Sequence, residues 1–476
     1  MDERRITAMN YTKITPALIE ELIGIVGKDY VYTDAERMQQ YASDETEDLV
    51  YMPELVVKPN TAKQISAIVK ICVERNVPLT PRGAGTGLSG GALALYGGIV
   101  LSTERFNNIL EIDERNLQAT VEPGVINEAF QDAVAEKGLF YPPDPASKGS
   151  CFMGGNISEN SGGPKCVKYG VTKDYVLNLE VVLPTGEIIY TGANTLKNST
   201  GYNLTQLMIG SEGTLGIVTK IIVRLIPLPK HNLLMLVPFR NTEEACMAVS
   251  EVFRAGYTPS ALEFMERDAL DWVSKYVQSS VVKIEDDVQA HLLIEVDGNN
   301  VDVLMGEMEA ISEVVSKFDI GEILFAETAA QKAELWQLRR KINEAVTSHA
   351  ISKEQDTVVQ RAELPKLVKG VKDIGKRYGF ASVCYGHAGD GNLHIRMIKG
   401  DMADDLWNGP HIKSAIAEMF VLCKQLGGTI SGEHGIGLVQ KEYMGLVMGE
   451  KEIELQKAIK KLFDPNMILN PGKMFV

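Results

Sequence analysis

The sequence predicts an α+β protein with more than one domain, and three observations support this class. The chain has 476 residues, whereas a single hydrophobic core rarely grows beyond about 250–300 residues. Its first half alternates short apolar runs with glycine-rich loops, a pattern typical of strands and turns. Its second half alternates strand-like runs with helical periodicity, which favours an antiparallel sheet carrying helices on one side.

The elements of the first half follow in order. Residues 14–27 predict a helix that begins at Thr15 and Pro16. A βαβ unit follows, with a strand at 55–57, a helix that begins at the capping box 61–64, and a second strand at 77–80. A glycine-rich loop then joins this strand to another strand rather than to a helix.

The next part of the chain is irregular. Residues 142–170 lack periodicity and are too long for an ordinary connection, so we expect them to hold a ligand. A hairpin is predicted at 177–192, with its turn at Pro184–Gly186. A glycine turn then leads into a long strand, and the first domain is expected to close near Pro229.

Composition excludes several classes of protein. The net charge of −15 argues against a nucleic-acid partner, which normally requires a basic face. The six cysteines include no CxxC pair, which argues against an iron–sulfur cluster or a zinc knuckle within the chain. No run of about 18 apolar residues and no apolar leader occur, so we expect no integral membrane segment and a cytoplasmic location.

Two short glycine-rich stretches near the end, GHAGDGNLH and SGEHGIG, contain three of the seven histidines. His387 and His394 can converge if the loop between them folds back. Glu433 then completes a His2Glu set with open positions, which suits a catalytic zinc, iron(II) or manganese ion. His434 is placed to act as a general base. The alternative is that these are loop histidines held by hydrogen bonds.

The loop PRGAGTGLSGGA contains a formal GxGxxG at Gly85, Gly87 and Gly90. A dinucleotide fingerprint of this kind must open a helix, and a Walker loop requires GK followed by Ser or Thr. Neither condition is met. Successive backbone N–H groups can still bind a pyrophosphate, and a turn that only permits close packing is the alternative.

Three motifs in fixed order carry a resemblance to a known family. PRGAGTGLSGG, PPDPAS with GGNISENSGG, and GSEGTLGIVT resemble the FAD-linked oxidases related to vanillyl-alcohol oxidase and p-cresol methylhydroxylase. The histidine stretches and LNPGK narrow this to the FAD-dependent 2-hydroxyacid dehydrogenases, namely D-lactate dehydrogenase, D-2-hydroxyglutarate dehydrogenase and the glycolate oxidase FAD subunit. The resemblance extends from about Tyr51 to Phe475.

The resemblance implies four parts. Residues 1–50 form an N-terminal helical segment, and residues 51–230 form a two-part FAD-binding domain of the p-cresol methylhydroxylase type. Residues 231–430 form an α+β substrate (cap) domain with an antiparallel sheet and the metal ligands. Residues 431–476 return as a helical segment to the FAD domain and complete the active site.

The resemblance also implies the cofactor and its contacts. FAD is expected to be non-covalent, because relatives that bind it covalently often place a histidine in the glycine loop and RGAGTG has none. The loop would contribute Arg82, Gly83, Ala84, Gly85, Thr86, Gly87 and Ser89. Further contacts are implied for Pro145, Ser147, Gly154, Gly155, Asn156, Ser161, Gly162, Glu212, Gly216, Ile217, Val218 and Asn470.

The implied activity is oxidation of a D-2-hydroxy acid, D-lactate above all, with hydride transfer to flavin N5. Arg339, in its WxLR context, would bind the substrate carboxylate, and Lys353 is a weaker candidate. Arg396 stands where relatives usually carry asparagine, so it would add a second carboxylate clamp or narrow the site.

The expected electron acceptor is a protein, either electron-transfer flavoprotein or an iron–sulfur subunit. Two other interpretations remain at this point. The chain could be a flavin-bearing electron-transfer subunit of a larger complex, or an FAD oxidase of another alcohol such as a phenol or a sugar.

Overall fold

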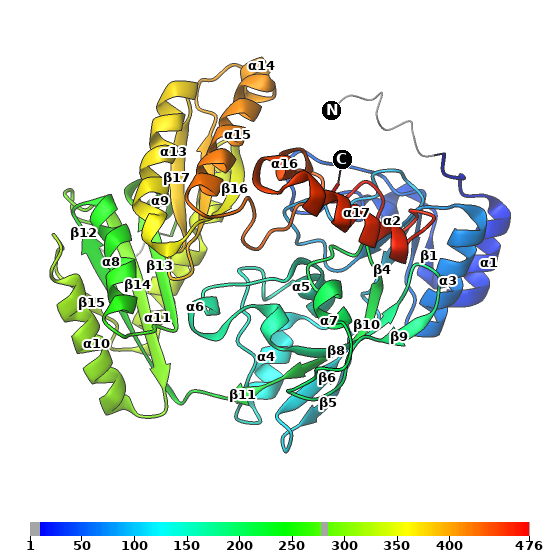
Figure 1. Cartoon of the computed structure of the whole chain (residues 1–476), viewed down its shortest axis with the longest axis horizontal. Coiled ribbons are helices and arrows are strands. Elements are labelled where there is room, and N and C mark those ends of the chain that lie inside the picture. The colour runs from blue at the N-terminus through cyan, green and yellow to red at the C-terminus, as the bar shows by residue number, and fades with distance from the viewer. Residues whose placement is uncertain (1–9, 278–283, 476) are drawn as a thin grey trace. The chain divides into compact units, whose positions relative to one another are not determined.

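The computed structural model describes residues 10–277 and 284–475, so residues 1–9 of the predicted N-terminal segment lie outside it. The chain divides into two compact units (Figure 1). Unit 1 comprises Met1–Ser161, Val171–Leu228 and Glu433–Val476, and unit 2 comprises Gly162–Gly170 and Pro229–Gly432. Within the described ranges, no helix has both the length and the apolar character needed to cross a bilayer.

The first sheet of unit 1 contains the predicted βαβ unit. Its strand order is β1 (Val31–Tyr32), β2 (Leu55–Val57), β4 (Ile99–Ser102) and β3 (Leu79–Arg82), and both β2 and β3 run parallel to β4. Helices α1 (Pro16–Val26) and α3 (Ala62–Arg75) pack on it. Thr15 and Thr61 cap these helices through their side chains, which confirms both predicted helix starts.

The second sheet of unit 1 is antiparallel. It has the order β5 (Ile109–Asp113), β6 (Gln118–Val121), β10 (Ile217–Arg224), β8 (Val176–Val182) and β9 (Ile188–Tyr190). Strands β8 and β9 are the predicted hairpin. Val182 and Ile217 join the hydrophobic core beneath the first sheet, so the two sheets share one core. Unit 1 also contains short elements outside these two sheets, among them α4 (Asn127–Ala135), β7 (Leu139–Phe140), α5 (Met153–Glu159) and α7 (Leu204–Met208).

The C-terminal segment returns to unit 1, as the predicted fold class requires. Helix α17 (Glu450–Phe463) precedes a short extended stretch that lies alongside β3. Leu469 forms a parallel bridge with Leu79, and the backbone N–H of Asn470 donates to the Leu79 carbonyl at 2.7 Å. The end of the chain therefore forms an edge of the first sheet.

The described residues of unit 2 form a seven-stranded antiparallel sheet. Its order is β15 (Leu324–Phe325), β12 (His231–Phe239), β14 (Ala290–Gly298), β13 (Ala261–Glu266), β17 (Ala381–His387), β18 (Asn392–Ile398) and β16 (Ser352–Val358). Because side chains alternate along a strand, this register puts Glu263, His387 and His394 on one face.

Helices cover both faces of this sheet, so the predicted one-sided arrangement was wrong. Helices α9 (Arg267–Val277), α11 (Ala329–Arg340) and α12 (Ile342–Thr347) pack on the face that carries Met265 and Tyr385. Helix α13 (Leu364–Tyr378) lies on the other face, where Lys372 pairs with Glu266 at 2.9 Å. Helical periodicity alone does not reveal which face of a sheet a helix covers.

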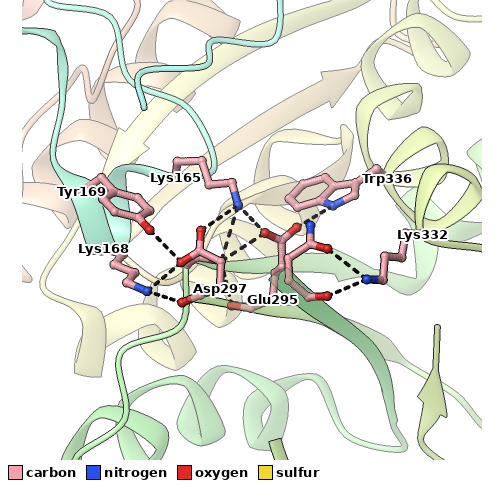
Figure 2. Close-up of polar contacts among 9 residues, drawn as sticks. Lys165, Lys168, Tyr169, Glu295, Asp297, Lys332 and Trp336 are labelled. Atoms are coloured by element: carbon pink, nitrogen blue, oxygen red, sulfur yellow. Dashed lines mark hydrogen bonds and ion pairs between the residues drawn. The ribbon is translucent and has the colours of Figure 1, made fainter. Parts of the chain in front are cut away.

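A segment from the middle of the unit 1 sequence belongs to unit 2. Residues 162–170, including α6 (Cys166–Tyr169), are attached to side chains of β14 by ion pairs (Figure 2). Lys165 pairs with Glu295, and Lys168 lies 2.6 Å from Asp297. The hydroxyl of Tyr169 donates to the same Asp297 carboxylate at 2.7 Å. Both carboxylates are buried, so these lysines offset a large desolvation cost.

Candidate active site

A buried carboxylate orients the first predicted metal ligand. His387, the last residue of β17, lies 2.9 Å through Nδ1 from both carboxylate oxygens of Glu263. Burial opposes ionisation of Glu263, but His387 and Arg339 outweigh it and hold its pKa below the usual value. Because Glu263 is a carboxylate, Nδ1 of His387 is the donor. Its Nε2 is thereby left as the nitrogen that can bind a metal ion.

The β17–β18 hairpin brings His387 and His394 together. The chain folds back between them, and the two ring centroids lie 5.5 Å apart. The turn depends on Gly391, whose φ of +87° and close approach to the Val359 carbonyl leave no room for a side chain. Two imidazoles thus share one face of unit 2, as the spacing of the motif predicted.

Arg396, predicted as a second group for a substrate carboxylate, is already bound by two side chains of strand β16. Its Nη2 lies 2.7 Å from Glu354 and its Nη1 lies 3.2 Å from the Ser352 hydroxyl. The side chain is only 2% exposed. Glu354 also lies 3.4 Å from Nδ1 of His394. The positive charge of Arg396 is therefore offset by its own strand partner on β16.

Lys353 is the one predicted substrate residue that the structure places away from the histidines. It neighbours Glu354 on β16, so alternation directs it to the opposite face of the sheet from His394. Its ammonium lies 5.4 Å from the ring centroid of Trp407. This placement does not support the predicted substrate contact, because a one-residue step along a strand reverses the face.

Arg339 has the environment of an anion-binding group. Its Nε lies 2.7 Å from Glu263 and its guanidinium stacks over Tyr385 with a centroid distance of 5.3 Å. The side chain is buried on α11. Among the described residues, nothing accepts a hydrogen bond from its Nη2. A buried guanidinium N–H without a protein acceptor is costly, and a substrate carboxylate would satisfy it.

Glu433 and His434 come directly after two residues, Ser431 and Gly432, that are hydrogen-bonded to Asp356. The backbone N–H of Gly432 and the hydroxyl of Ser431 both donate to Asp356 at 2.8 Å. Asp356 is paired in register with His394. Glu433 is thus attached one peptide bond after a residue that is held on the histidine-bearing part of unit 2, although it is counted with unit 1.

The predicted cofactor loop of unit 1 has open space beside its backbone and is supported by the buried side chain of Arg82. Among the described residues, no heavy atom lies within 4 Å of the place that a Cβ would take at Gly87 or Gly155. A ligand can therefore approach both backbones closely. Arg82 has another role, because its guanidinium donates to the carbonyls of Gln40 and Ser43. The guanidinium also lies next to the backbone of Gly85, so it supports the loop.

Three other predicted cofactor residues, Asn470, Ile217 and Gly162, lie in different surroundings. The Asn470 amide donates to the Gly91 carbonyl at 3.0 Å and to the Glu212 carbonyl at 2.8 Å, which joins three distant segments of unit 1. Ile217 is 2% exposed and packs in the core, so only its backbone is available for a ligand. Gly162 is counted with unit 2 rather than with the other members of the set.

Sequence reasoning missed four carboxylates near these motifs: Glu159, Glu263, Glu354 and Asp356. One of them was detectable in principle. Glu263 lies in a strand that is buried along its whole length, and a buried acid in a strand requires a partner. Burial raises the pKa of Glu159 well above its usual value, and the nearby Glu212 raises it further.

Replacing Glu263 with alanine is expected to lower the free energy of unfolding by about 3–5 kcal/mol, because it leaves the buried Arg339 unpaired. Urea unfolding followed by circular dichroism checks this value. Glu251→Ala is the control, since Glu251 pairs only with the exposed Arg254 and such pairs contribute about 0–1 kcal/mol. Equal effects of the two variants would contradict the structural role assigned to Glu263.

The fold and these side chains define a flavoprotein oxidoreductase. A family model described as "FAD binding domain" matches residues 53–192, and one described as "FAD linked oxidases, C-terminal domain" matches residues 228–474. The chain belongs to the FAD-linked oxidase family.

Two relatives match almost the whole chain. It is 41% identical to the glycolate oxidase subunit GlcD of Bacillus subtilis, with 97% of each chain covered. It is 37% identical to a D-lactate dehydrogenase of Anaerostipes hadrus, with 98% of each covered. The fold is similar to that of p-cresol methylhydroxylase with substrate bound, with a TM-score of 0.73, 18% identity and 96% of each chain covered. The predicted fold class and family are confirmed.

Proposed function

We propose that this FAD-linked oxidoreductase oxidises a small D-2-hydroxy monocarboxylic acid, D-lactate above all, to the 2-oxo acid. One observation carries the proposal most directly. Glu263 binds both His387 and the buried Arg339, so one carboxylate orients a metal ligand and a carboxylate-binding group together. A 2-hydroxy acid presents a hydroxyl and a carboxylate on neighbouring atoms, which matches such a pair.

We propose that His387, His394 and Glu433 bind a divalent ion. The donor set supports this, because Nδ1 of His387 is held by Glu263 and its Nε2 is left for coordination. Two imidazoles and a carboxylate suit zinc, iron(II) or manganese. When bound, such an ion would lower the pKa of the substrate hydroxyl, and non-covalent FAD would accept the hydride.

The chain's own residues would then orient the substrate and move a proton. Arg339 binds the substrate carboxylate through the guanidinium nitrogen that has no acceptor among the described residues. His434 takes the hydroxyl proton as general base. Fixing the carboxylate and hydroxyl in one geometry also lowers the entropic cost of reaction.

The substrate class is supported by the state of Arg396. A dicarboxylate such as 2-hydroxyglutarate needs a second cation for its distal carboxylate. Arg396 is already bound by Glu354 and is 2% exposed, so it is poorly available. The two relatives described above are named for glycolate and D-lactate, which are both monocarboxylates.

A panel of D- and L-2-hydroxy acids tests this proposal, with anaerobic flavin bleaching as the readout and metal analysis of the same sample. We expect D-lactate to reduce the flavin fastest, with L-lactate and D-2-hydroxyglutarate slower by at least about tenfold, the effect of roughly 1.4 kcal/mol. Protein that stays colourless after reconstitution with FAD would contradict the function. Faster bleaching by D-2-hydroxyglutarate would contradict the monocarboxylate class alone.

We also propose that a protein accepts the electrons, either electron-transfer flavoprotein or an iron–sulfur subunit. The glycine loop supports this, because it leads from β3 into β4 and not into the helix that a nicotinamide dinucleotide site uses. Reoxidation of the reduced flavin should be faster with electron-transfer flavoprotein than with NAD. Rapid reoxidation by NAD would contradict it.

A further inference from the structure

The segment 431–437, which carries Glu433 and His434, is held at both ends by a buried carboxylate. On its N-terminal side, Asp356 accepts hydrogen bonds from the Ser431 hydroxyl and the Gly432 N–H at 2.8 Å each. On its C-terminal side, Glu212 accepts from the backbone N–H groups of Ile436 and Gly437 at 2.7 Å each.

Both Asp356 and Glu212 are also held by contacts outside this segment. Asp356 is 1% exposed and its other oxygen accepts from the Asn392 amide at 2.7 Å. Glu212 is 4% exposed and has a left-handed backbone with φ of +51°. Its own carbonyl accepts from the Asn470 amide at 2.8 Å.

The path of the segment requires glycine at two positions. Gly435 has φ of +80°, and a Cβ there would collide with Glu159. Gly437 has φ of +49°, and a Cβ there would collide with the carbonyl of Ser89. Three residues, 433–435, lie between the two carboxylate-bound ends. The position of Glu433 and His434 is therefore set by contacts on either side of them.

We propose that Asp356 and Glu212 are positioning residues, which fix the geometry of the proposed metal ligand Glu433 and the proposed base His434. This inference rests on the proposed function. Neither residue supplies a ligand atom or accepts the substrate proton. Loss of either carboxylate should therefore weaken binding of the divalent ion and slow the chemical step.

Glu212→Gln and Asp356→Asn test the proposal with little change in volume. Both oxygens of Glu212 accept from backbone N–H groups, so an amide NH2 must oppose one donor. We expect the Kd for Zn²⁺ or Mn²⁺ to rise about 10–100-fold, the usual cost of losing a partner that orients a ligand. We expect kcat to fall, with little change in KM for D-lactate, when both proteins are compared fully loaded with FAD.

Each variant has a matched control. Glu180→Gln removes another buried carboxylate of unit 1, which binds Lys220 and Thr219 on the second sheet. Glu266→Gln does the same in unit 2, where Glu266 binds Lys372 and the Cys384 N–H. These controls should reduce thermal stability without changing the Kd for the ion, which separates positioning from general destabilisation.

Isothermal titration of the chelator-treated, FAD-loaded protein with Zn²⁺ or Mn²⁺ gives the main readout. If Glu212→Gln or Asp356→Asn fails to fold, Ser431→Ala removes a single hydrogen bond to Asp356 and should still weaken metal binding several-fold. Parent-like Kd and kcat in all three variants would overturn this inference and leave the proposed function standing. A parent protein that binds no divalent ion would overturn the proposed function as well.

Discussion

Replacing His434 with glutamine is expected to lower kcat for D-lactate oxidation by about 10²–10⁴-fold, the usual contribution of a positioned general base. Glutamine keeps a polar side chain of similar length but cannot take up the hydroxyl proton at neutral pH. FAD content should remain that of the parent protein. Anaerobic stopped-flow reduction of the flavin measures the effect directly, without any contribution from the electron acceptor.

His231→Gln is the control for this change, since His231 is exposed at the start of β12 and should tolerate substitution. Flavin reduction at the parent rate in His434→Gln would contradict the assigned base. That result would favour a non-catalytic role for His434 and leave oxidation of D-lactate to the rest of the site. Slow reduction that recovers at high pH would instead support loss of a base, because hydroxide can then accept the hydroxyl proton in place of His434.

Removal of the divalent ion is expected to have the second large effect. His387→Ala should abolish detectable metal in the purified protein and lower kcat by more than about 100-fold, beyond the 10–100-fold cost of losing only a partner that orients a ligand. The reason is that alanine removes a ligand and also leaves Glu263 with Arg339 alone. Elemental analysis and flavin reduction by D-lactate, made on one sample, test this together.

Chelation of the parent protein supplies the control for that variant. Activity should be lost with the ion and return when Zn²⁺ or Mn²⁺ is added back, whereas His387→Ala should not recover. Full activity in chelated protein that contains no metal would contradict the proposed role of the ion. It would leave the flavin chemistry in place and point to Arg339 and His434 alone.

Local patterns in the sequence predicted local structure well. The caps at Thr15 and Thr61, the hairpin of β8 and β9, and the loop between two strands each depend on a few neighbouring residues, and all are confirmed. The convergence of His387 and His394 was predictable for the same reason, because the six residues between them include two glycines and favour a short turn.

Long-range partners were not predictable in this way. Glu263 lies 124 residues before His387, and only the order of strands in the sheet brings them together. Lys353 lies on the opposite face of the sheet from His394, because the face of a strand reverses at every residue. Arg396 was expected to bind substrate, yet Glu354 neutralises it from a neighbouring strand. Each case requires the strand register, which a single sequence does not contain.

The nine residues 162–170 have a consequence for how this protein can be divided. They lie within the sequence of unit 1 but supply the lysines that neutralise Glu295 and Asp297 in unit 2. A fragment made of residues 229–432 would carry both buried acids without these basic partners. The two units therefore cannot be separated by a single cut, and exchange of one unit between relatives would have to carry this short insert with it.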